Sequence, residues 1–172
     1  MKLISYHHNQ QACFGAVVDD HVIDLGKHFP GIDNLAALLA DEQLLEQARA
    51  RVASADPDYP LASVQLDPVI PAPGKVICVG INYVAHAEEA GRKVGQYPVI
   101  FQRFAETLLA HGEPLLRPAV SEQFDFEAEL AVVIGKGGAH IAVEDAIANV
   151  TDEKLKAELT GRRCILPHGQ EM

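Results

Sequence analysis

The sequence predicts an α+β fold, and three observations support this prediction. The first 25 residues alternate short β-branched and aromatic runs with turn residues, as small antiparallel strands do. Leucines then recur at helical spacing between residues 33 and 53. After a proline-rich stretch, apolar runs that end in glycine indicate further strands, of which residues 125–135 form the central one. We therefore expect a small domain over 1–70 and a strand-rich region over 71–150.

Composition excludes several classes of function. The chain has 172 residues, of which 48% are hydrophobic and 22% charged, as in a globular protein. Its net charge of −10 and the lack of a basic cluster beyond Arg162-Arg163 argue against nucleic acid or an anionic membrane as partner. No apolar run approaches the roughly 18 residues of a membrane span. Three widely spaced cysteines and the lack of an apolar leader predict reduced thiols and a cytoplasmic protein.

The small domain is expected to begin with three strands and continue with two helices. Asp19-Asp20 is a plausible hairpin turn between the second and third strands. Asp33 or Asn34 can cap the first helix, and the second is expected over residues 41–53 with one apolar face. The strands are predicted at Lys2–Tyr6, Cys13–Val18 and Val22–Leu25. The apolar positions of the two helices are Leu35, Leu38, Leu39, Leu44, Leu45, Ala48 and Val52. We expect three histidines at the surface, namely His7, His8 and His21. The proline density of residues 54–74 predicts a linker or an extended crossing.

A strand–helix pair follows this crossing. Residues 75–80 indicate a short buried strand closed by glycine, and Asn82 and Gly91 suit the two ends of a helix over residues 83–90. His86 and Glu89 are three residues apart and therefore share one face of that helix. A carboxylate beside an imidazole raises its basicity, as a general base requires. A solvated His–Glu pair on the surface is the alternative.

Two further strands carry charged candidates. Residues 98–104 predict a strand on which Arg103 is available to an anionic group. In the central strand, Glu127 and Glu129 point the same way, roughly 7 Å apart, because strand side chains alternate. Such a pair needs a cation, a shared proton or a basic partner, unless the strand lies at an edge with both carboxylates solvated. Carboxylate oxygens favour Mg²⁺, Mn²⁺ or Ca²⁺ over zinc. Residues 143–150 predict a short helix.

These motifs and their order resemble the fumarylacetoacetate hydrolase family. The resemblance rests on Gly80-Ile81-Asn82-Tyr83 with His86 and Glu89, on Pro98-Val99-Ile100-Phe101, and on Asp125-Phe126-Glu127-Ala128-Glu129-Leu130-Ala131-Val132-Val133-Ile134-Gly135. It implies a β-rich, β-roll-like catalytic domain, usually dimeric, that acts on small keto or diketo acids by hydrolysis, decarboxylation or isomerisation. It also implies that Glu127 and Glu129 bind Mg²⁺ or Mn²⁺ and that His86 and Glu89 hold or deprotonate water.

The resemblance ends after Val150. The family continues with a G-Y-x-x-x-N-D segment whose aspartate is a third metal ligand, whereas residues 151–172 read TDEKLKAELTGRRCILPHGQEM. We interpret this divergent tail, with a possible short helix up to Gly161, as a truncation or a shifted reading frame. We then expect weak metal binding, little turnover, exposed apolar residues around 130–134 and a tendency to oligomerise. A catalytically silent binding or scaffold paralogue, or a non-functional fragment, is the alternative.

Overall fold

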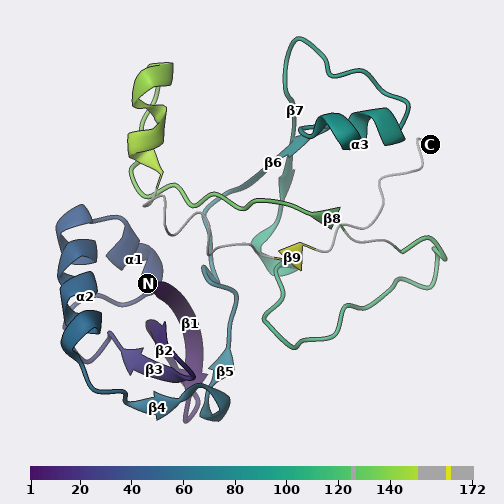
Figure 1. Cartoon of the computed structure of the whole chain (residues 1–172). Coiled ribbons are helices and arrows are strands. Elements are labelled where there is room, and N and C mark those ends of the chain that lie inside the picture. The colour runs from purple at the N-terminus through teal and green to yellow at the C-terminus, as the bar shows by residue number, and fades with distance from the viewer. Residues whose placement is uncertain (125–126, 151–161, 164–172) are drawn as a thin grey trace. The chain divides into compact units, whose positions relative to one another are not determined.

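The computed structural model describes residues 1–124, 127–150 and 162–163, with the backbone alone for 127–128, 147 and 162–163. The chain divides into two compact units, and each is described by itself. The first contains Met1–Ile70 together with Ala110–Met172, and the second contains Pro71–Leu109. The chain contains both helices and strands (Figure 1), which confirms the predicted α+β class.

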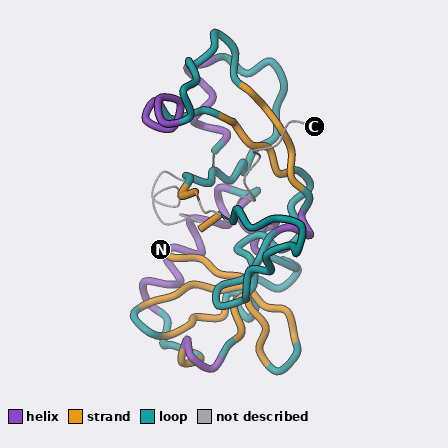
Figure 2. The backbone as a smooth tube through the Cα atoms, turned by 90° about the vertical axis from the view of Figure 1, so that its right-hand side faces the viewer, coloured by secondary structure: helices purple, strands orange, loops and turns teal. Residues whose placement is uncertain are grey.

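A curled, five-stranded antiparallel sheet forms the base of the first unit (Figure 2). Its strand order is β4-β3-β2-β1-β5. The three predicted strands are confirmed, and Asp19-Asp20 forms the tight turn, since Val18 pairs with His21. The strands are β1 Lys2–His8, β2 Gln11–Val18, β3 His21–Asp24, β4 Tyr59–Pro60 and β5 Gln65–Leu66.

The turn between β1 and β2 was not expected from the sequence. His8 pairs with Gln11, so Asn9 and Gln10 alone connect the strands, with φ angles of 51° and 66°. Two consecutive residues with positive φ give a turn whose twist matches that of the flanking strands. Asparagine tolerates this conformation, but glutamine is a poor sequence signal for it.

Two capped helices cover one face of this sheet. Helix α1 (Leu35–Leu39) has Asn34 as its N-cap, and α2 (Glu42–Ser54) has Asp41, whose carboxylate accepts from two backbone N–H groups. Both predicted helices are thus confirmed. Their apolar faces join the sheet residues in one core, whose buried members are Leu3, Phe14, Ala16, Ile23, Leu25, Phe29, Leu35, Leu38, Leu39, Leu45 and Ala48.

The proline-rich segment is more structured than predicted. Residues 54–74 contain β4, the 3₁₀ turn η1 (Leu61–Ser63) and β5, and both strands lie at edges of the sheet. Of the two predicted alternatives, the extended crossing agrees with these edge strands, and the linker without regular structure does not. Proline is tolerated in an edge strand because its missing N–H faces away from the ladder, which explains Pro60 in β4.

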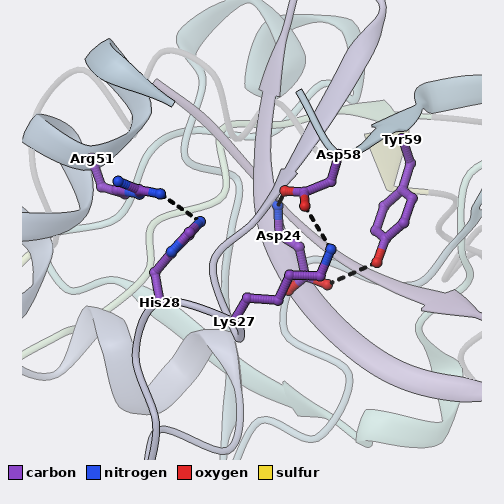
Figure 3. A network of polar contacts seen from close by, with 6 residues as sticks. All are labelled: Asp24, Lys27, His28, Arg51, Asp58 and Tyr59. Carbon is purple, nitrogen blue, oxygen red and sulfur yellow. Dashed lines mark hydrogen bonds and ion pairs between the residues drawn. The ribbon is translucent and has the colours of Figure 1, made fainter. Parts of the chain in front are cut away.

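Polar side chains join this segment to β3 (Figure 3). The backbone N–H of Asp24 donates to the Asp58 carboxylate at 2.8 Å, and Lys27 Nζ contacts the other Asp58 oxygen at 2.5 Å. Partial burial opposes ionisation of Asp58, but the Lys27 contact and the Asp24 N–H together lower its pKa. Tyr59 donates to Asp24 at 3.5 Å, and Lys27 lies 4.6 Å from the centre of the Tyr59 ring. Asp58 therefore connects the segment that precedes β4 to the end of β3.

Three histidines and one cysteine of the first unit differ in their exposure and in the residues that they contact. His21 is exposed as predicted, whereas His7 is half-buried and contacts Asp67 at 2.8 Å. His8 is half-buried and stacks on Tyr59 with 4.0 Å between ring centres, so its prediction as a surface residue is wrong. Cys13 is a free thiol, and its pKa is raised mainly by burial and also by the nearby Asp24 carboxylate.

The second unit consists of a strand pair and one helix. Strands β6 (Val76–Gly80) and β7 (Val99–Arg103) are antiparallel with Cys78 opposite Phe101, and α3 (Val84–Glu89) lies between them in the chain. Both strands were predicted, but the expectation that β6 is buried is wrong. Only Cys78 of β6 is buried, while Ile77 and Ile100 are each 62% exposed. Ile100 pairs with Val79, which is two residues after Ile77 in β6, so the side chains of Ile77 and Ile100 share one face of the strand pair.

The remaining described residues belong to the first unit and contain little regular structure. They include the 3₁₀ segment η3 (Val143–Asn149), where a short helix was predicted, and the strands β8 (Glu127–Ala128) and β9 (Arg162–Arg163). A further 3₁₀ turn, η2 (Ala105–Thr107), ends the second unit. The predicted tail helix up to Gly161 lies outside the described residues.

Candidate active site

The strand–helix junction of the second unit presents His86 and Glu89. Helix α3 is one residue shorter at each end than predicted, because its N-cap is Tyr83 rather than Asn82 and its C-cap is Ala90. Gly91 follows with a φ of 64° and donates to the carbonyl of Glu88, while Arg92 donates to that of Ala87. This pair of bonds is the Schellman motif, in which glycine suits the left-handed position.

His86 and Glu89 both lie on the solvent side of α3. Each is exposed, whereas Ala87 is only 2% exposed and lies on the buried side of the helix. Their spacing of three residues keeps the two side chains on neighbouring positions of one helical surface. An exposed imidazole next to a carboxylate is accessible to a small molecule and is able to accept a proton from it.

Ile81 lies immediately before this helix in an unusual conformation. Its φ is 53°, in the left-handed region that β-branched residues avoid. Such a residue costs of order 1–3 kcal/mol and is found most often where a chain must hold a functional group in a fixed position. The Gly80-Ile81-Asn82-Tyr83 motif therefore contains a strained turn between β6 and α3, which the residue types did not indicate.

Arg103 ends β7 with an incompletely paired guanidinium. It lies opposite Val76 in the strand pair and is half-buried. Its Nε and Nη2 atoms are shielded from solvent, and neither has a hydrogen-bond partner among the residues that the structure describes. Because shielding a cation without an acceptor is unfavourable, this arrangement suits a site that receives an anionic group.

The two glutamates lie in and just after a very short strand. Strand β8 contains only Glu127 and Ala128, with Glu127 opposite Arg163 of β9. Glu129 follows directly and is half-buried. Strand β9 was not among the strands predicted from the sequence. Asp125 and Phe126, which opened the predicted central strand, lie outside the described residues.

The rest of the predicted central strand differs from the expectation of a buried strand. Leu130 is 53% exposed, Val132 47% and Ile134 62%. Ile134 makes one isolated bridge with Val150, and Val133 packs against the core of the first unit. A strand becomes buried only when neighbouring strands and a covering layer are present, and β8 pairs with just two described residues. The prediction of exposed apolar residues here is confirmed.

The five candidate residues belong to different units. His86, Glu89 and Arg103 lie in the second unit, and the two glutamates lie in the first. Among the described residues, no group of three or more His, Cys, Asp or Glu side chains is arranged to bind a metal ion. Two carboxylates nevertheless supply the hard oxygen donors that Mg²⁺ and Mn²⁺ prefer, so the donor chemistry of Glu127 and Glu129 fits such an ion.

Comparison with known proteins gives a consistent result. The family described as "Fumarylacetoacetate (FAA) hydrolase C-terminal" matches residues 75–167. Oxaloacetate tautomerase FAHD2A, mitochondrial, of Homo sapiens is 37% identical over 121 residues, which are 70% of this chain and 38% of that protein. Oxaloacetate tautomerase Fahd2a, mitochondrial, of Rattus norvegicus is 31% identical over 152 residues, 87% of this chain and 49% of that protein.

Solved structures of similar fold come from the same group of proteins. Maleylpyruvate hydrolase from Sphingobium sp. SYK-6, solved with manganese(II) and pyruvate, has a TM-score of 0.68 and 27% identity. The match covers 87% of this chain and 55% of that one. Fumarylacetoacetate hydrolase from Exiguobacterium antarcticum has a TM-score of 0.60 and 26% identity, covering 87% of this chain and 52% of that one. The chain thus spans about half the length, or less, of these relatives.

No helix of the described residues is long and apolar enough to cross a membrane.

Proposed function

Because the chain belongs to the fumarylacetoacetate hydrolase family, we propose that it provides residues for metal-dependent chemistry on small keto or diketo acids. The observation that carries this proposal is the Gly80–Glu89 motif, which forms a strained turn and a helix with His86 and Glu89 exposed together. Relatives named as oxaloacetate tautomerases and a similar structure with manganese and pyruvate support the same class of substrate.

We assign metal binding to Glu127 and Glu129, with Mg²⁺ or Mn²⁺ as the ion. Their spacing of two residues and their hard oxygen donors favour this role. A bound ion would supply Lewis-acid stabilisation of the negative charge that develops on a keto-acid oxygen. The two carboxylates alone give an incomplete ligand set, so we expect affinity in the millimolar range.

His86 is the proposed base, and Glu89 orients it. In tautomerisation, His86 would accept the proton from the carbon next to the ketone and return a proton to the enolate oxygen. In hydrolysis, it would instead accept a proton from the attacking water.

Arg103 is the proposed partner of the substrate's charged group. Its two shielded nitrogen atoms without described partners would gain hydrogen bonds when a carboxylate arrives. A charge-assisted pair of this kind is directional and therefore fixes the orientation of a planar carboxylate.

The organisation of the chain follows from the same family. We propose a small domain over 1–70, the first part of a β-roll-like catalytic domain over 71–150, and a distinct tail over 151–172. A homodimer is the proposed assembly, and the exposed apolar residues of β6 and β7 are available to it.

The decisive experiment measures metal binding and turnover together. The chain is titrated with Mn²⁺ to about 10 mM while its melting temperature is followed, since an ion that binds the folded state raises it. Tautomerisation of oxaloacetate and cleavage of acetylpyruvate are then assayed with saturating Mn²⁺. We expect Glu129→Gln to abolish the thermal shift and His86→Ala to retain the shift but lose turnover.

The exposed Glu122 provides the matched control, because Glu122→Gln makes the same change outside the proposed site. An unchanged melting temperature with Mn²⁺ in the wild-type chain would refute the metal assignment. A metal-dependent shift without turnover of either substrate would favour a binding protein over an enzyme.

A further inference from the structure

A second charged site lies in the second unit, beside the strained turn. A cavity of about 340 Å³ opens at the end of β6 and the start of β7. The residues that line it come from three segments of this unit, namely the end of β6 and its turn, the loop after α3, and the start of β7. They are Val79, Gly80, Ile81, Asn82, Lys93, Val94, Gly95, Gln96, Tyr97, Pro98 and Val99.

The lining has a clear chemical character. Lys93 is its single charged residue, and no acidic side chain contributes to the wall. Asn82 and Gln96 add amide groups that donate hydrogen bonds, and Tyr97 adds a phenol. In a chain of net charge −10, a cavity that holds one cation and several donors is a local exception. Such a set recognises an anion that accepts several hydrogen bonds, and a carboxylate has this chemistry.

The shape of the cavity depends on backbone features that the fold maintains at a cost. Ile81 in the wall has a φ of 53°, which is strained for a β-branched residue. This turn places Asn82 directly between the strand end and the helix that presents His86. At about 340 Å³, the cavity lies at the small end of typical ligand sites and has ample room for a carboxylate and the atoms next to it.

From these observations we infer that the cavity is a carboxylate subsite in which Lys93 selects substrates with a second acid group. The inference rests on the proposed function, because it assigns one end of a keto-acid substrate to this cavity. Lys93 is thereby a specificity-determining residue, and Asn82 and Gln96 would donate hydrogen bonds to the same carboxylate. During turnover, oxaloacetate would place its second carboxylate in the cavity, whereas acetylpyruvate, whose far end is a methyl ketone, has no second acid group to place there.

The first test is independent of turnover. Fumarate, a dicarboxylate without a keto group, is titrated into the ¹⁵N-labelled chain up to about 50 mM, and crotonate serves as the matched monocarboxylate. We expect amide shifts at Asn82, Lys93 and Gln96 with both, since one carboxylate suffices for the cavity. Lys93→Met should weaken the binding of both acids by about threefold to tenfold, which lies between the loss of a solvent-exposed ion pair and that of a charge-assisted hydrogen bond. Lys75→Met is the control, because Lys75 is exposed in the same unit but does not line the cavity.

The second test uses turnover with Mn²⁺. Lys93→Met should lower kcat/KM for oxaloacetate by the same threefold to tenfold and leave that for acetylpyruvate unchanged. Equal losses for both substrates, or none, would overturn the role in specificity. Cavity amides that do not move with either acid, or that move equally in Lys93→Met, would overturn the subsite itself. If the wild-type chain turns over neither substrate, the proposed function fails, and the first test still decides whether the cavity binds carboxylates.

Discussion

Replacement of Asp58 tests how the proline-rich segment is attached to the first unit. Asp58→Ala removes the acceptor of the Asp24 backbone N–H and also the partner of Lys27. Asp24 is only 6% exposed, so its N–H would remain unpaired and shielded from water. Asp58→Asn retains an oxygen for that N–H and removes only the charge. The pair of variants therefore separates the hydrogen bond from the ion pair.

The magnitude follows from the exposure of each partner. A shielded N–H without an acceptor costs about 1–3 kcal/mol. The Lys27 contact contributes about 0.2–1 kcal/mol, because the Lys27 side chain is 47% exposed and solvent screens the pair. We expect Asp58→Ala to lower the free energy of unfolding by about 2–3 kcal/mol and Asp58→Asn by less than about 1 kcal/mol. For a chain of this length, each kcal/mol lowers Tm by about 2–4 °C.

Lowering the pH should show how much the ion pair between Lys27 and Asp58 contributes to stability. The pKa of Asp58 is lowered in the folded state, so its ionised form contributes stability above the ordinary carboxyl pKa of about 3.9. That contribution is lost as the pH falls through the folded pKa. The difference between the wild-type chain and Asp58→Asn should therefore be largest near neutral pH and decrease below about pH 4.

Urea denaturation followed by circular dichroism measures these differences at several pH values. Equal losses in Asp58→Ala and Asp58→Asn would refute the role of the Asp24 N–H. A difference between wild type and Asp58→Asn that stays constant down to about pH 3 would refute the ion pair.

Three further predictions concern packing. Gly15→Ala should lower the free energy of unfolding in urea by about 1–3 kcal/mol, because a Cβ at this position would overlap the Ile23 carbonyl oxygen. As the control, Gly74→Ala should leave that free energy unchanged, because a Cβ there would meet open space. Leu38→Ala should cost about 2–5 kcal/mol by calorimetry, since Leu38 is fully buried in the core, while the exposed Ala36→Ser should change little. The double variant Ile77→Ser/Ile100→Ser should reduce association in sedimentation, since both side chains are 62% exposed on one face; unchanged association would exclude that face.

The sequence was most informative where local chemistry decides the structure. Asn34, one of the two predicted caps, lies directly before Leu35 and accepts the backbone N–H of Ala37, and Asp41, where the second helix was expected to begin, is the N-cap of α2. Asp19-Asp20 lies between two apolar runs and forms their turn. In these cases a few neighbouring residues determine the outcome, so the pattern was sufficient.

The predictions failed where partners from elsewhere in the chain decide the structure. Tyr59–Pro60 and Gln65–Leu66 lie in the proline-rich segment, yet they form strands because the edges of β3 and β1 offer unpaired backbone groups. Residues 130–134 have the composition of a buried strand, yet Leu130 and Ile134 are exposed because the described chain provides no strand pair along them beyond one bridge. The cavity with Lys93 was missed because its three segments carry no common motif.

The position of β5 in the sheet has a consequence for the order of folding. Strands β1, β2 and β3 are joined by two-residue turns, so their pairing closes only short loops. Strand β5 returns to β1 after both helices and pairs through Tyr6 and His7 alone. Closing that long loop costs more chain entropy and gains few hydrogen bonds. The β1–β3 meander should therefore assemble first and protect its amides longest, while β5 detaches repeatedly and exposes residues 61–70 to proteolysis without unfolding the core.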